Sequence, residues 1–363
     1  MKALILVGGY GTRLRPLTFS VPKPLVELAN KPIVAHQIEA LVKVGVTEVV
    51  LAIAYQPQTM MEYIKKFEEQ YKIKITCSQE IEPLGTAGPI RLAQEILEKD
   101  NEDGLFFVLN SDIVCEFPLQ KLVDFHKAHG KEGTIMLTQV EEPSKYGVVV
   151  AEPDGKIKRF VEKPKEFISN KINAGLYIFN KKMISRIEPK PTSIEREIFP
   201  KMAEEGELYA QVLEGFWMDV GQPKDFITGN QLYLDSLRKT EPSLLAKGDN
   251  ILGNVLIDPS AKVDPEAILG PNVCIGPNVV IEAGVRLQNT TVFRGSTIQA
   301  HTWIKGAIIG WESKVGKWCR IEGVTVLAED VQVKDEIYIK ACSILPHKAV
   351  TSNLPDAGTV VMQ

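Results

Sequence analysis

A six-residue rhythm of apolar side chains in the last third of the chain limits how that part can fold. Two successive registers are apolar at every step, namely Ile257, Val263, Leu269, Ile275, Ile281, Leu287, Phe293 and then Ile309, Val315, Ile321, Leu327, Val333, Ile339, Leu345. Only 44% of the chain is hydrophobic, so chance does not produce this pattern. A second register of smaller residues runs beside the first, at Ala261, Ala267, Val273, Val279 and Val285. This hexapeptide repeat predicts a left-handed parallel β-helix, whose inward side chains stack from coil to coil.

The repeat predicts about five coils, because three six-residue steps make one coil. Gly-Pro-Asn occurs at 270–272 and again at 276–278, where the chain needs corners. The phase slips between the two registers, so we expect a loop or bulge near Gln299–Ala307. The alternative is an ordinary β-sandwich with accidental spacing.

Short apolar runs alternate with helical patterns over the first 240 residues. We expect buried strands at 3–7, 48–53, 73–77 and 105–109, and helices at 32–44 (with Asn30 as a candidate cap), 86–99 and 119–129. This alternation predicts βαβ units, a mostly parallel sheet with helices on both faces, and a site at the carboxyl ends of the strands. The runs at 134–140, 147–151 and 172–179 predict an antiparallel extension, and the capping box Thr192–Glu195 predicts another helix.

These patterns predict three parts of the chain. An α/β domain covers residues 1–240, and a β-helix domain covers residues 251–345. The junction lies around Ser236–Asn250, where Pro and Gly residues break both patterns. Residues 346–363 lose the repeat and form a C-terminal tail that packs back on the body.

Composition and charge exclude several classes of protein. The chain has 42 Lys and Arg against 46 Asp and Glu, a net charge of −4 without a block of one sign, so it is not suited to neutralising nucleic-acid phosphates. Its early apolar run, Ala3–Val7, ends at Gly8-Gly9 and is too short for a signal peptide or a membrane span. Five scattered cysteines offer neither a disulfide framework nor a zinc site, which fits a reducing cytoplasm.

A glycine-rich loop follows the first predicted strand. Residues 8–17 read GGYGTRLRPL, and Lys23 follows in VPKP at 21–24. Glycines let the backbone approach a ligand and present N–H groups to an anion, while Arg13 and Lys23 add positive charge. The loop lacks the Gly-Lys-Ser/Thr of a P-loop, and Leu14 stands where the dinucleotide fingerprint has glycine. The alternative interpretation is a tight turn that binds nothing.

Six motifs in order resemble those of the sugar-nucleotide pyrophosphorylases. They are the glycine loop with PKPL at 22–25, PLGTAG at 83–88, LNSD at 109–112, VEKP at 161–164, NAG at 173–175 and FWMDVG at 216–221. With the β-helix, the resemblance covers nearly the whole chain. Within the family it is closest to the catalytic beta-type enzymes that form GDP-mannose.

The resemblance implies a Rossmann-like nucleotidyltransferase domain and a specific reaction. Mannose 1-phosphate would attack the α-phosphorus of GTP in line, giving GDP-mannose for glycosylation and releasing diphosphate. Because both reactants are anions, the site must mainly align them and neutralise charge. Asp112 and Asp219 are the expected ligands of one Mg²⁺, an ion that keeps few protein ligands.

Further roles are carried over by the same resemblance. The catalytic residues would be Arg13, Lys23, Asp112, Lys163 and Asp219. The nucleotide would contact Leu6, Gly8, Gly9, Gly11, Thr12, Arg13, Lys23, Glu80, Gly85 and Asn110. The sugar phosphate would contact Gly147, Glu162, Lys163 and Asn173.

A carboxylate suits guanine because it accepts hydrogen bonds from both N1–H and the exocyclic amine, a donor pair that uracil and thymine lack. Glu80 is our preferred reader of the base and Glu82 the alternative, with backbone groups of Leu6 and Gly85 completing the pocket. Blander roles stay open for other residues: Asp112 as a helix cap, Lys163 as a solvated turn lysine, and Trp217 as a core aromatic.

Three other functions compete with this reading. One is a thymidylyl- or uridylyltransferase acting on glucose 1-phosphate. Another is a non-catalytic regulatory paralogue that binds GDP-mannose, although such a protein would not need to keep all five charged residues. The third is an acyltransferase using His301 or His347, since some left-handed β-helices have that activity. We also expect the β-helix to form a homo-oligomer, or a hetero-oligomer with a regulatory paralogue, because its stacked coils leave ends that need covering.

Overall fold

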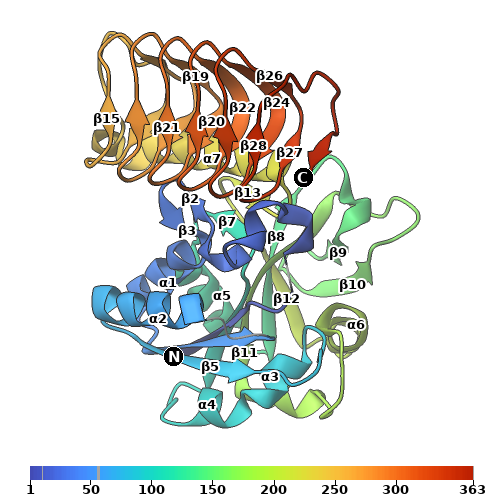
Figure 1. Ribbon diagram of the computed structural model, residues 1–363. Coiled ribbons are helices and arrows are strands. Elements are labelled where there is room, and N and C mark those ends of the chain that lie inside the picture. The colour runs from blue at the N-terminus through green and yellow to red at the C-terminus, as the bar shows by residue number, and fades with distance from the viewer. Residues whose placement is uncertain (10, 55–57, 363) are drawn as a thin grey trace. The chain divides into compact units, whose positions relative to one another are not determined.

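The protein is represented by a computed structural model that describes residues 1–9, 11–54 and 58–362 (Figure 1). It divides into two compact units. Residues 1–9 and 34–217 form the first, which we call the sheet unit, and residues 10–33 and 218–363 form the second, the repeat unit. This division differs from the expected boundary at residue 240, because residues 218–240, and the segment with Arg13 and Lys23, cluster with the β-helix.

A mixed sheet forms the centre of the sheet unit. Its main strand order is β10-β9-β11-β6-β1-β4-β5, and β8 pairs with β11 and β12. The parallel strands are β1 (Lys2–Leu6), β4 (Glu48–Ile53), β5 (Lys74–Gln79) and β6 (Leu105–Asn110). Runs such as LFFVLN in β6 are almost entirely buried, as expected of strands covered on both faces.

The antiparallel extension is confirmed. Strand β11 (Lys171–Asn180) runs antiparallel to β6, to β8 (Gly133–Gln139) and to β9 (Gly147–Ala151). Strand β10 (Ile157–Glu162) pairs antiparallel with β9, and β12 (Leu208–Val212) pairs parallel with β8. The mixed α/β fold predicted for this part is therefore correct.

The helices of the sheet unit partly follow the sequence patterns. They are α1 (Ile33–Lys43), α2 (Gln58–Tyr71), α3 (Gly88–Leu92), α4 (Gln94–Glu98), α5 (Leu119–His129) and α6 (Phe199–Glu204). The single helix expected at 86–99 is broken at Ala93, and α2 was not predicted. Asn30 is not a cap, because it lies in a β-turn and its side chain donates to the carbonyl of Ile275 at 2.7 Å.

The predicted capping box is displaced by one residue. Ser193, not Thr192, is the N-cap, and its hydroxyl accepts from the N–H of Arg196 while Glu197 accepts from the N–H of Ser193 at 2.9 Å. A wide helical turn, Ile194–Ile198, then leads into α6. The carboxylate of Glu195 instead accepts hydrogen bonds from the hydroxyl of Ser193, at 2.9 Å, and from that of Thr86, as described below.

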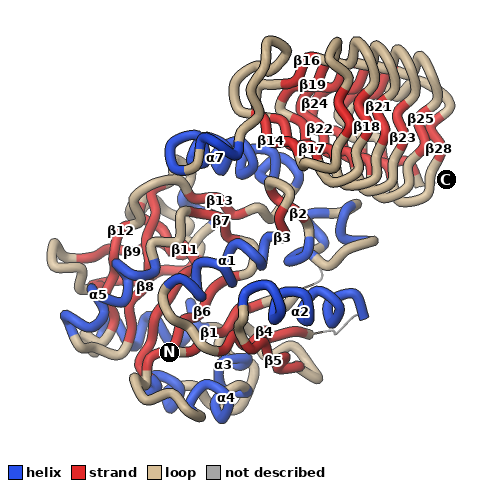
Figure 2. Tube along the Cα trace, turned by 90° about the vertical axis from the view of Figure 1, so that its left-hand side faces the viewer, coloured by secondary structure: helices blue, strands red, loops and turns tan. Residues whose placement is uncertain are grey.

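The repeat unit contains the predicted parallel β-helix. Its two ladders run β14-β17-β20-β22-β24-β27-β29 and β15-β18-β21-β23-β25-β28, with β16, β19 and β26 beside the first. Figure 2 shows β18, β21, β23, β25 and β28 side by side in this order. The strands are β14 (Val255–Ile257), β15 (Lys262–Val263), β16 (Ile268–Leu269), β17 (Val273–Ile275), β18 (Val280–Ile281), β19 (Arg286–Gln288), β20 (Thr290–Val292), β21 (Thr297–Ile298), β22 (Trp303–Ile309), β23 (Lys314–Val315), β24 (Arg320–Leu327), β25 (Gln332–Val333), β26 (Tyr338–Lys340), β27 (Ser343–Ile344), β28 (Ala349–Val350) and β29 (Val360–Val361).

Most of the predicted inward positions are buried in one continuous core, but two are wrong. Val292 and Ile344 take the inward places expected for Phe293 and Leu345. The register shortens first between Leu287 and Val292, ahead of the predicted Gln299–Ala307 stretch. An irregularity between Lys305 and Ala307 does fall inside that stretch.

Local backbone conformation explains the corners of the β-helix, and strand pairing shows where the coils end. Asn272 and Asn278, the last residues of the two Gly-Pro-Asn corners, have φ of 58° and 57°, a left-handed conformation that Asn tolerates better than most residues. The C-terminal segment continues the coils, since β28 pairs with β25 and β29 with β27. The expectation that residues 346–362 leave the repeat is therefore wrong.

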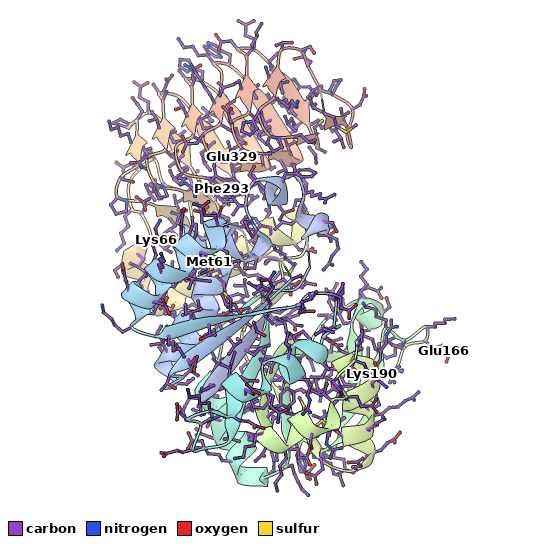
Figure 3. All side chains as sticks on the ribbon, turned by 60° about the horizontal axis from the view of Figure 1, so that its bottom comes forward. Met61, Lys66, Glu166, Lys190, Phe293 and Glu329 are labelled. Carbon is purple, nitrogen blue, oxygen red and sulfur yellow. The ribbon has the colours of Figure 1, made fainter. Side chains whose placement is uncertain are left out.

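Helix α7 (Pro223–Thr240) packs on the β-helix within the repeat unit. Phe226 of α7 meets the ring of Phe293, which in turn stacks on Trp311 with ring centroids 4.7 Å apart (Phe293 is labelled in Figure 3). The apolar side chain of Phe293 therefore packs against helix α7, although the repeat pattern predicted that it lies inside the coils. Among the described residues, no helix is both long and apolar enough to cross a membrane.

Candidate active site

The glycine loop begins at the edge of the sheet where the parallel strands end. Leu6 is paired with Ala52 of β4 and Asn110 of β6, so the carboxyl ends of three strands share this edge. Gly8 and Gly9 follow β1 and are exposed, and Tyr10 lies outside the described residues. The predicted location at the carboxyl ends of the strands therefore holds for the first part of the loop.

Glu80 faces this loop. The residue is 6% exposed, and a Cβ on Gly8 would lie 3.6 Å from its Oε1. Its Oε2 accepts a hydrogen bond from the N–H of Leu84 at 2.8 Å. Glu82 is exposed, so the geometry favours Glu80 of the two candidates for reading the base.

The segment that follows Glu80 is fixed by close backbone contact. Gly85 has φ of 76°, and a Cβ there would lie 2.5 Å from the carbonyl oxygen of Thr192. The N–H of Thr192 donates to Leu84, and the carbonyl of Thr192 accepts from Ala87, both at 3.0 Å. Only glycine fits this position, which explains why the loop carries it.

Glu195, which the sequence pattern did not single out for the site, interacts with two residues of the predicted site motifs. Its Oε2 accepts from the hydroxyl of Thr86 at 2.6 Å, and its charge is one of the groups that raise the pKa of Glu162. Its position three residues after Thr192 pointed only to a capping box. The contact with Thr86 spans more than a hundred residues of sequence, so no local pattern signals it.

Residues assigned to the sugar phosphate gather on β9 and β10. Glu162 is directly opposite Gly147 in this ladder, and a Cβ on Gly147 would lie 2.9 Å from Oε2 of Glu162. Burial, more than the neighbouring charge of Glu195, raises the pKa of Glu162. The exposed Lys163 places its Nζ 3.4 Å from Oε1 of Glu162, and the loop after it projects from the sheet with Glu166 at its outer end (Figure 3).

The NAG and LNSD motifs meet through Gly175. A Cβ on Gly175 would lie 2.8 Å from Nδ2 of Asn110. Asn173 donates to the hydroxyl of Tyr177 at 2.8 Å and accepts from the N–H of Gly175 at 3.0 Å. Asn110 and Asn173, predicted for nucleotide and sugar respectively, thus flank the same glycine.

Asp112 and Trp217 both belong to the sheet unit, and each has a defined local structure. Asp112 is half-buried and precedes strand β7 (Ile113–Cys115), so the helix-cap alternative is wrong. The indole of Trp217 donates to the carbonyl of Ala174 at 2.9 Å and meets Tyr146 edge-on. Trp217 therefore supports the NAG strand, which agrees with giving it no catalytic role.

The repeat unit brings together the other predicted charged residues. A Cβ on Gly221 would lie 2.8 Å from Oδ1 of Asp219 and 2.9 Å from Nη2 of Arg13, so the carboxylate and the guanidinium pack against the same Cα. A Cβ on Gly11 would lie 3.0 Å from the Cβ of Lys23. The next residue, Thr12, is exposed at the start of a short helical turn.

The predicted site residues include carboxylate oxygens that could bind a divalent metal ion. Among the described residues, no three His, Cys, Asp or Glu side chains are grouped to hold an ion. Oδ1 of Asp219 is shielded from solvent and is a hard oxygen donor. This chemistry fits an ion that takes one or two carboxylates and completes its shell with substrate phosphates and water. The sharing of one ion by Asp112 and Asp219 stays a prediction.

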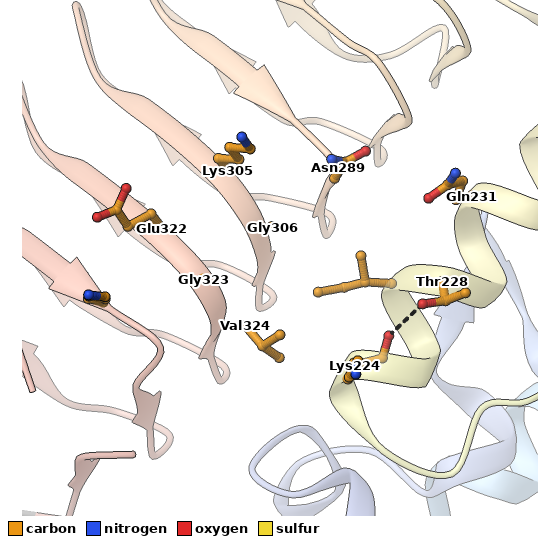
Figure 4. Close-up of a pocket in the computed structure, with 11 residues that line it drawn as sticks. Lys224, Thr228, Gln231, Asn289, Lys305, Gly306, Glu322, Gly323 and Val324 are labelled. Atoms are coloured by element: carbon orange, nitrogen blue, oxygen red, sulfur yellow. Dashed lines mark hydrogen bonds between the residues drawn. The ribbon is translucent and has the colours of Figure 1, made fainter. Parts of the chain in front are cut away.

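Two other features do not join this set. His301 stacks on Trp318 with ring centroids 4.3 Å apart, and the exposed His347 pairs with Asp330 at 3.0 Å. A pocket of about 560 Å³ lies beside α7 (Figure 4). Its lining contains none of the predicted site residues; it comprises Lys224, Ile227, Thr228, Gln231, Asn289, Lys305, Gly306, Glu322, Gly323, Val324 and Lys340.

Comparisons with known proteins agree with this geometry. Residues 2–236 match the nucleotidyl transferase family, and residues 251–360 match the GMPPB C-terminal domain. A mannose-1-phosphate guanyltransferase of Schizosaccharomyces pombe is 58% identical over 365 residues, covering 100% of both chains. A protein of Dictyostelium discoideum named mannose-1-phosphate guanylyltransferase catalytic subunit beta is 60% identical over 362 residues, covering 99% of this chain and all of its own.

Solved structures show the same fold for the first part. HddC from Yersinia pseudotuberculosis has a TM-score of 0.54 and 28% identity, covering 64% of this chain and 99% of its own. A candidate glucose-1-phosphate thymidylyltransferase from Bacillus anthracis has a TM-score of 0.58 at 22% identity, covering 64% and 94%, which shows the fold alone.

Nucleotidyl transferases of this kind generally use a divalent metal, and they act on a nucleotide and a sugar phosphate. The glycine loop, the buried Glu80 and the charged residues beside Gly221 supply groups suited to such substrates. The full-length identity extends the likeness through the β-helix. The chain belongs to the mannose-1-phosphate guanylyltransferase family of nucleotidyl transferases.

Proposed function

We propose that this chain transfers GMP from GTP to α-D-mannose 1-phosphate, giving GDP-mannose and diphosphate. The observation that carries the proposal is the 58–60% identity, over essentially the full length, to relatives named for this activity. The charged residues that the reaction needs are all present. The reaction needs no covalent intermediate, so binding, alignment and charge neutralisation are the tasks of the protein.

Arg13 and Lys23 act on the triphosphate. Their positive charges offset the negative charge that builds on the diphosphate as it leaves, while N–H groups of the glycine loop bind phosphate oxygens. Packing against Gly221 limits the freedom of the Arg13 guanidinium. The nucleotide is thereby held with its α-phosphorus exposed to attack from the opposite side.

Glu80 selects guanine. Its Oε2 is engaged by the backbone of Leu84, which fixes the carboxylate in place and leaves Oε1 directed toward Gly8. A fixed carboxylate accepts from the guanine N1–H and exocyclic amine, which uracil and thymine do not offer together. GTP is therefore preferred over UTP and dTTP.

Glu162, Lys163, Asn173 and Gly147 form the sugar-phosphate side. Lys163 binds the phosphate of mannose 1-phosphate and reduces the repulsion between two anions. Glu162 accepts hydrogen bonds from sugar hydroxyls, and Asn173 accepts or donates them. The absence of a side chain at Gly147 lets Phe160 and Glu162 approach its Cα. These contacts align the attacking phosphate oxygen.

Asp112 and Asp219 are proposed to bind Mg²⁺. The chemistry supplied by the bound ion is neutralisation of charge on the α-phosphate and orientation of its oxygens. Both side chains are half-buried, which restricts their motion, and carboxylate oxygens are the ligands that Mg²⁺ prefers.

The β-helix is proposed to mediate self-association, or association with a regulatory paralogue, in the cytoplasm. In its first coil Ile257 and Val263 are only half-buried, and Leu252 just before it is 47% exposed. Apolar side chains at the end of a coil stack gain stability when another surface covers them.

Diphosphate release from GTP, Mg²⁺ and mannose 1-phosphate tests the proposed activity. Turnover must exceed that of Asp219→Ala, and a wild-type rate no higher than this variant would refute the proposal. A parallel panel with UTP, dTTP and glucose 1-phosphate separates the guanylyltransferase from a thymidylyl- or uridylyltransferase. GDP-mannose binding without turnover would instead identify a regulatory paralogue.

A further inference from the structure

The segment that carries Arg13 and Lys23 is attached to the β-helix through a buried carboxylate. Glu27, four residues after Lys23, accepts a hydrogen bond at Oε2 from the indole N–H of Trp311, 2.6 Å away. Its Oε1 accepts from Nη1 of Arg294 at 2.9 Å. The side chain of Glu27 is 13% exposed and Trp311 is 1% exposed, so the hydrogen bond between them is shielded from water, whereas the Arg294 side chain is 40% exposed. Such charge-assisted hydrogen bonds are strong and directional.

A short hairpin extends this attachment. Strands β2 (Glu27–Leu28) and β3 (Lys31–Pro32) are joined by Ala29 and Asn30, whose φ values of 50° and 61° are those of a tight hairpin turn. The N–H of Ala29 donates to Oδ1 of Asn230 on α7 at 2.9 Å, and Nδ2 of Asn30 donates to the carbonyl of Ile275 at 2.7 Å. Asn230 itself donates to Thr291 of the β-helix at 2.9 Å.

The chain between Glu27 and Lys23 is buried and held by backbone hydrogen bonds. Pro24, Leu25 and Val26 are fully buried, and the N–H of Val26 donates to the carbonyl of Lys23 at 3.2 Å. Ile33 returns a hydrogen bond to Val26 at 3.0 Å. On the other side of Lys23, its Cβ packs against the Cα of Gly11 in the glycine loop. A shift of Glu27 therefore moves both the lysine and the loop that it supports.

We propose that Glu27 is a positioning residue for Lys23, and that Arg294 and Trp311 make the β-helix part of the nucleotide site. Burial, the largest influence, raises the pKa of Glu27, and the interactions with Trp311 and Arg294 act in the opposite direction. Packing of Trp311 on Phe293, and of Phe293 on Phe226, fixes the indole in turn. The assignment rests on the proposed role of Lys23 at the triphosphate.

Steady-state kinetics of full-length variants test the proposal. Glu27→Ala should raise the KM for GTP about tenfold, because a small displacement of a binding group has a large effect on alignment. The KM for mannose 1-phosphate should not change, since the residues assigned to the sugar belong to the sheet unit. A purely structural role would lower the folded fraction, reducing kcat while leaving both KM values as they were.

Two conservative variants keep the test decisive if Glu27→Ala folds poorly. Glu27→Gln retains an acceptor for Trp311 but loses the charge that pairs with Arg294, and Trp311→Phe loses the indole donor together with part of the buried ring that stacks on Phe293. Each should raise the KM for GTP by a smaller factor than Glu27→Ala.

The β-helix offers a matched control. Like Glu27, Glu322 accepts hydrogen bonds from an arginine and an aromatic side chain, in this case Arg320 and the hydroxyl of Tyr338. Glu322 lies on the coil surface that lines the pocket in Figure 4. Glu322→Gln removes a comparable pair of contacts and should leave the KM for GTP unchanged. An increase equal to that of Glu27→Gln would overturn the proposal.

Hydrogen exchange supplies a readout that does not depend on turnover. Peptides covering residues 11–26 should exchange faster in Glu27→Ala and Trp311→Phe than in the wild type, with exchange in the central sheet unchanged. Absence of GTP turnover in the wild-type chain would refute the proposed function but leave this comparison intact. Unchanged exchange in 11–26, or equal rises in both KM values, would show that Glu27 does not position Lys23.

Discussion

Gly85 packs its Cα so closely against the carbonyl oxygen of Thr192 that a Cβ at residue 85 would lie 2.5 Å from that oxygen. The contact ties the loop after Glu80 to the segment that leads into α6. Because Glu80 accepts from the backbone of Leu84 in the same loop, the position of the carboxylate depends on this close approach.

Gly85→Ala should destabilise the protein and lower its activity. The variant combines a left-handed backbone with a steric clash, a cost of more than about 2 kcal/mol in the free energy of unfolding. Gly130→Ala is the matched control, because Gly130 has φ of 65° and nothing within 4 Å of its built Cβ. Urea unfolding of both variants checks this. Equal losses would mean that the contact with Thr192 contributes nothing.

Glu80→Gln should lower kcat/KM for GTP by about 10- to 100-fold, the usual effect of losing a hydrogen bond to a charged group. The amide keeps one acceptor for Leu84, so the melting temperature should stay close to that of the wild type. Glu82→Gln is the control, since Glu82 is exposed. A larger loss for Glu82→Gln would transfer the base-reading role to that residue.

Gly147→Ala should impair use of the sugar phosphate selectively. The added methyl would lie 2.6 Å from the ring of Phe160 and 2.9 Å from Oε2 of Glu162, so the Glu162 carboxylate must move. We expect the KM for mannose 1-phosphate to rise about tenfold while the KM for GTP stays the same. Parallel kinetics with each substrate varied in turn measure the difference. A rise in the KM for GTP alone would contradict the assignment of Gly147.

Stability should fall as the solution becomes acidic, because of the buried His126 and the half-buried His129. Nδ1 of His126 and Nε2 of His129 contact the hydroxyl of Thr134 at 2.8 and 2.7 Å. Burial lowers the pKa of both rings from 6.5 to about 4, so both are neutral in the folded protein at pH 7. The unfolded chain binds protons more readily than the folded one. The contribution of the two neutral histidines to the free energy of unfolding is therefore complete above pH 6.5 and is lost as the pH falls through 4.

Melting temperatures between pH 7.5 and 4.5 check this prediction. The double variant His126→Gln, His129→Gln should show a flatter decline than the wild type over this range. His347→Gln, at an exposed ion pair with Asp330, should leave the slope unchanged. A wild-type melting temperature that does not vary from pH 6.5 to 4.5 would exclude the two histidines as the cause.

The sequence by itself determined the elements whose residues repeat at short intervals. Apolar runs marked β4 and β9 to the residue, and the six-residue rhythm gave the β-helix, because burial on one face imposes a local period that composition alone does not. The motifs also indicated the family and the charged residues of the site.

Only the tertiary structure decided which distant residues meet. It showed that residues 10–33 cluster with the β-helix, that Glu27 contacts Trp311 across 284 positions of sequence, and that Glu195 serves Thr86 rather than a helix cap. It also turned Phe293 away from the coil interior toward α7. Contacts between segments far apart leave no period in either one, because each side chain is chosen to fit a partner that local sequence does not contain.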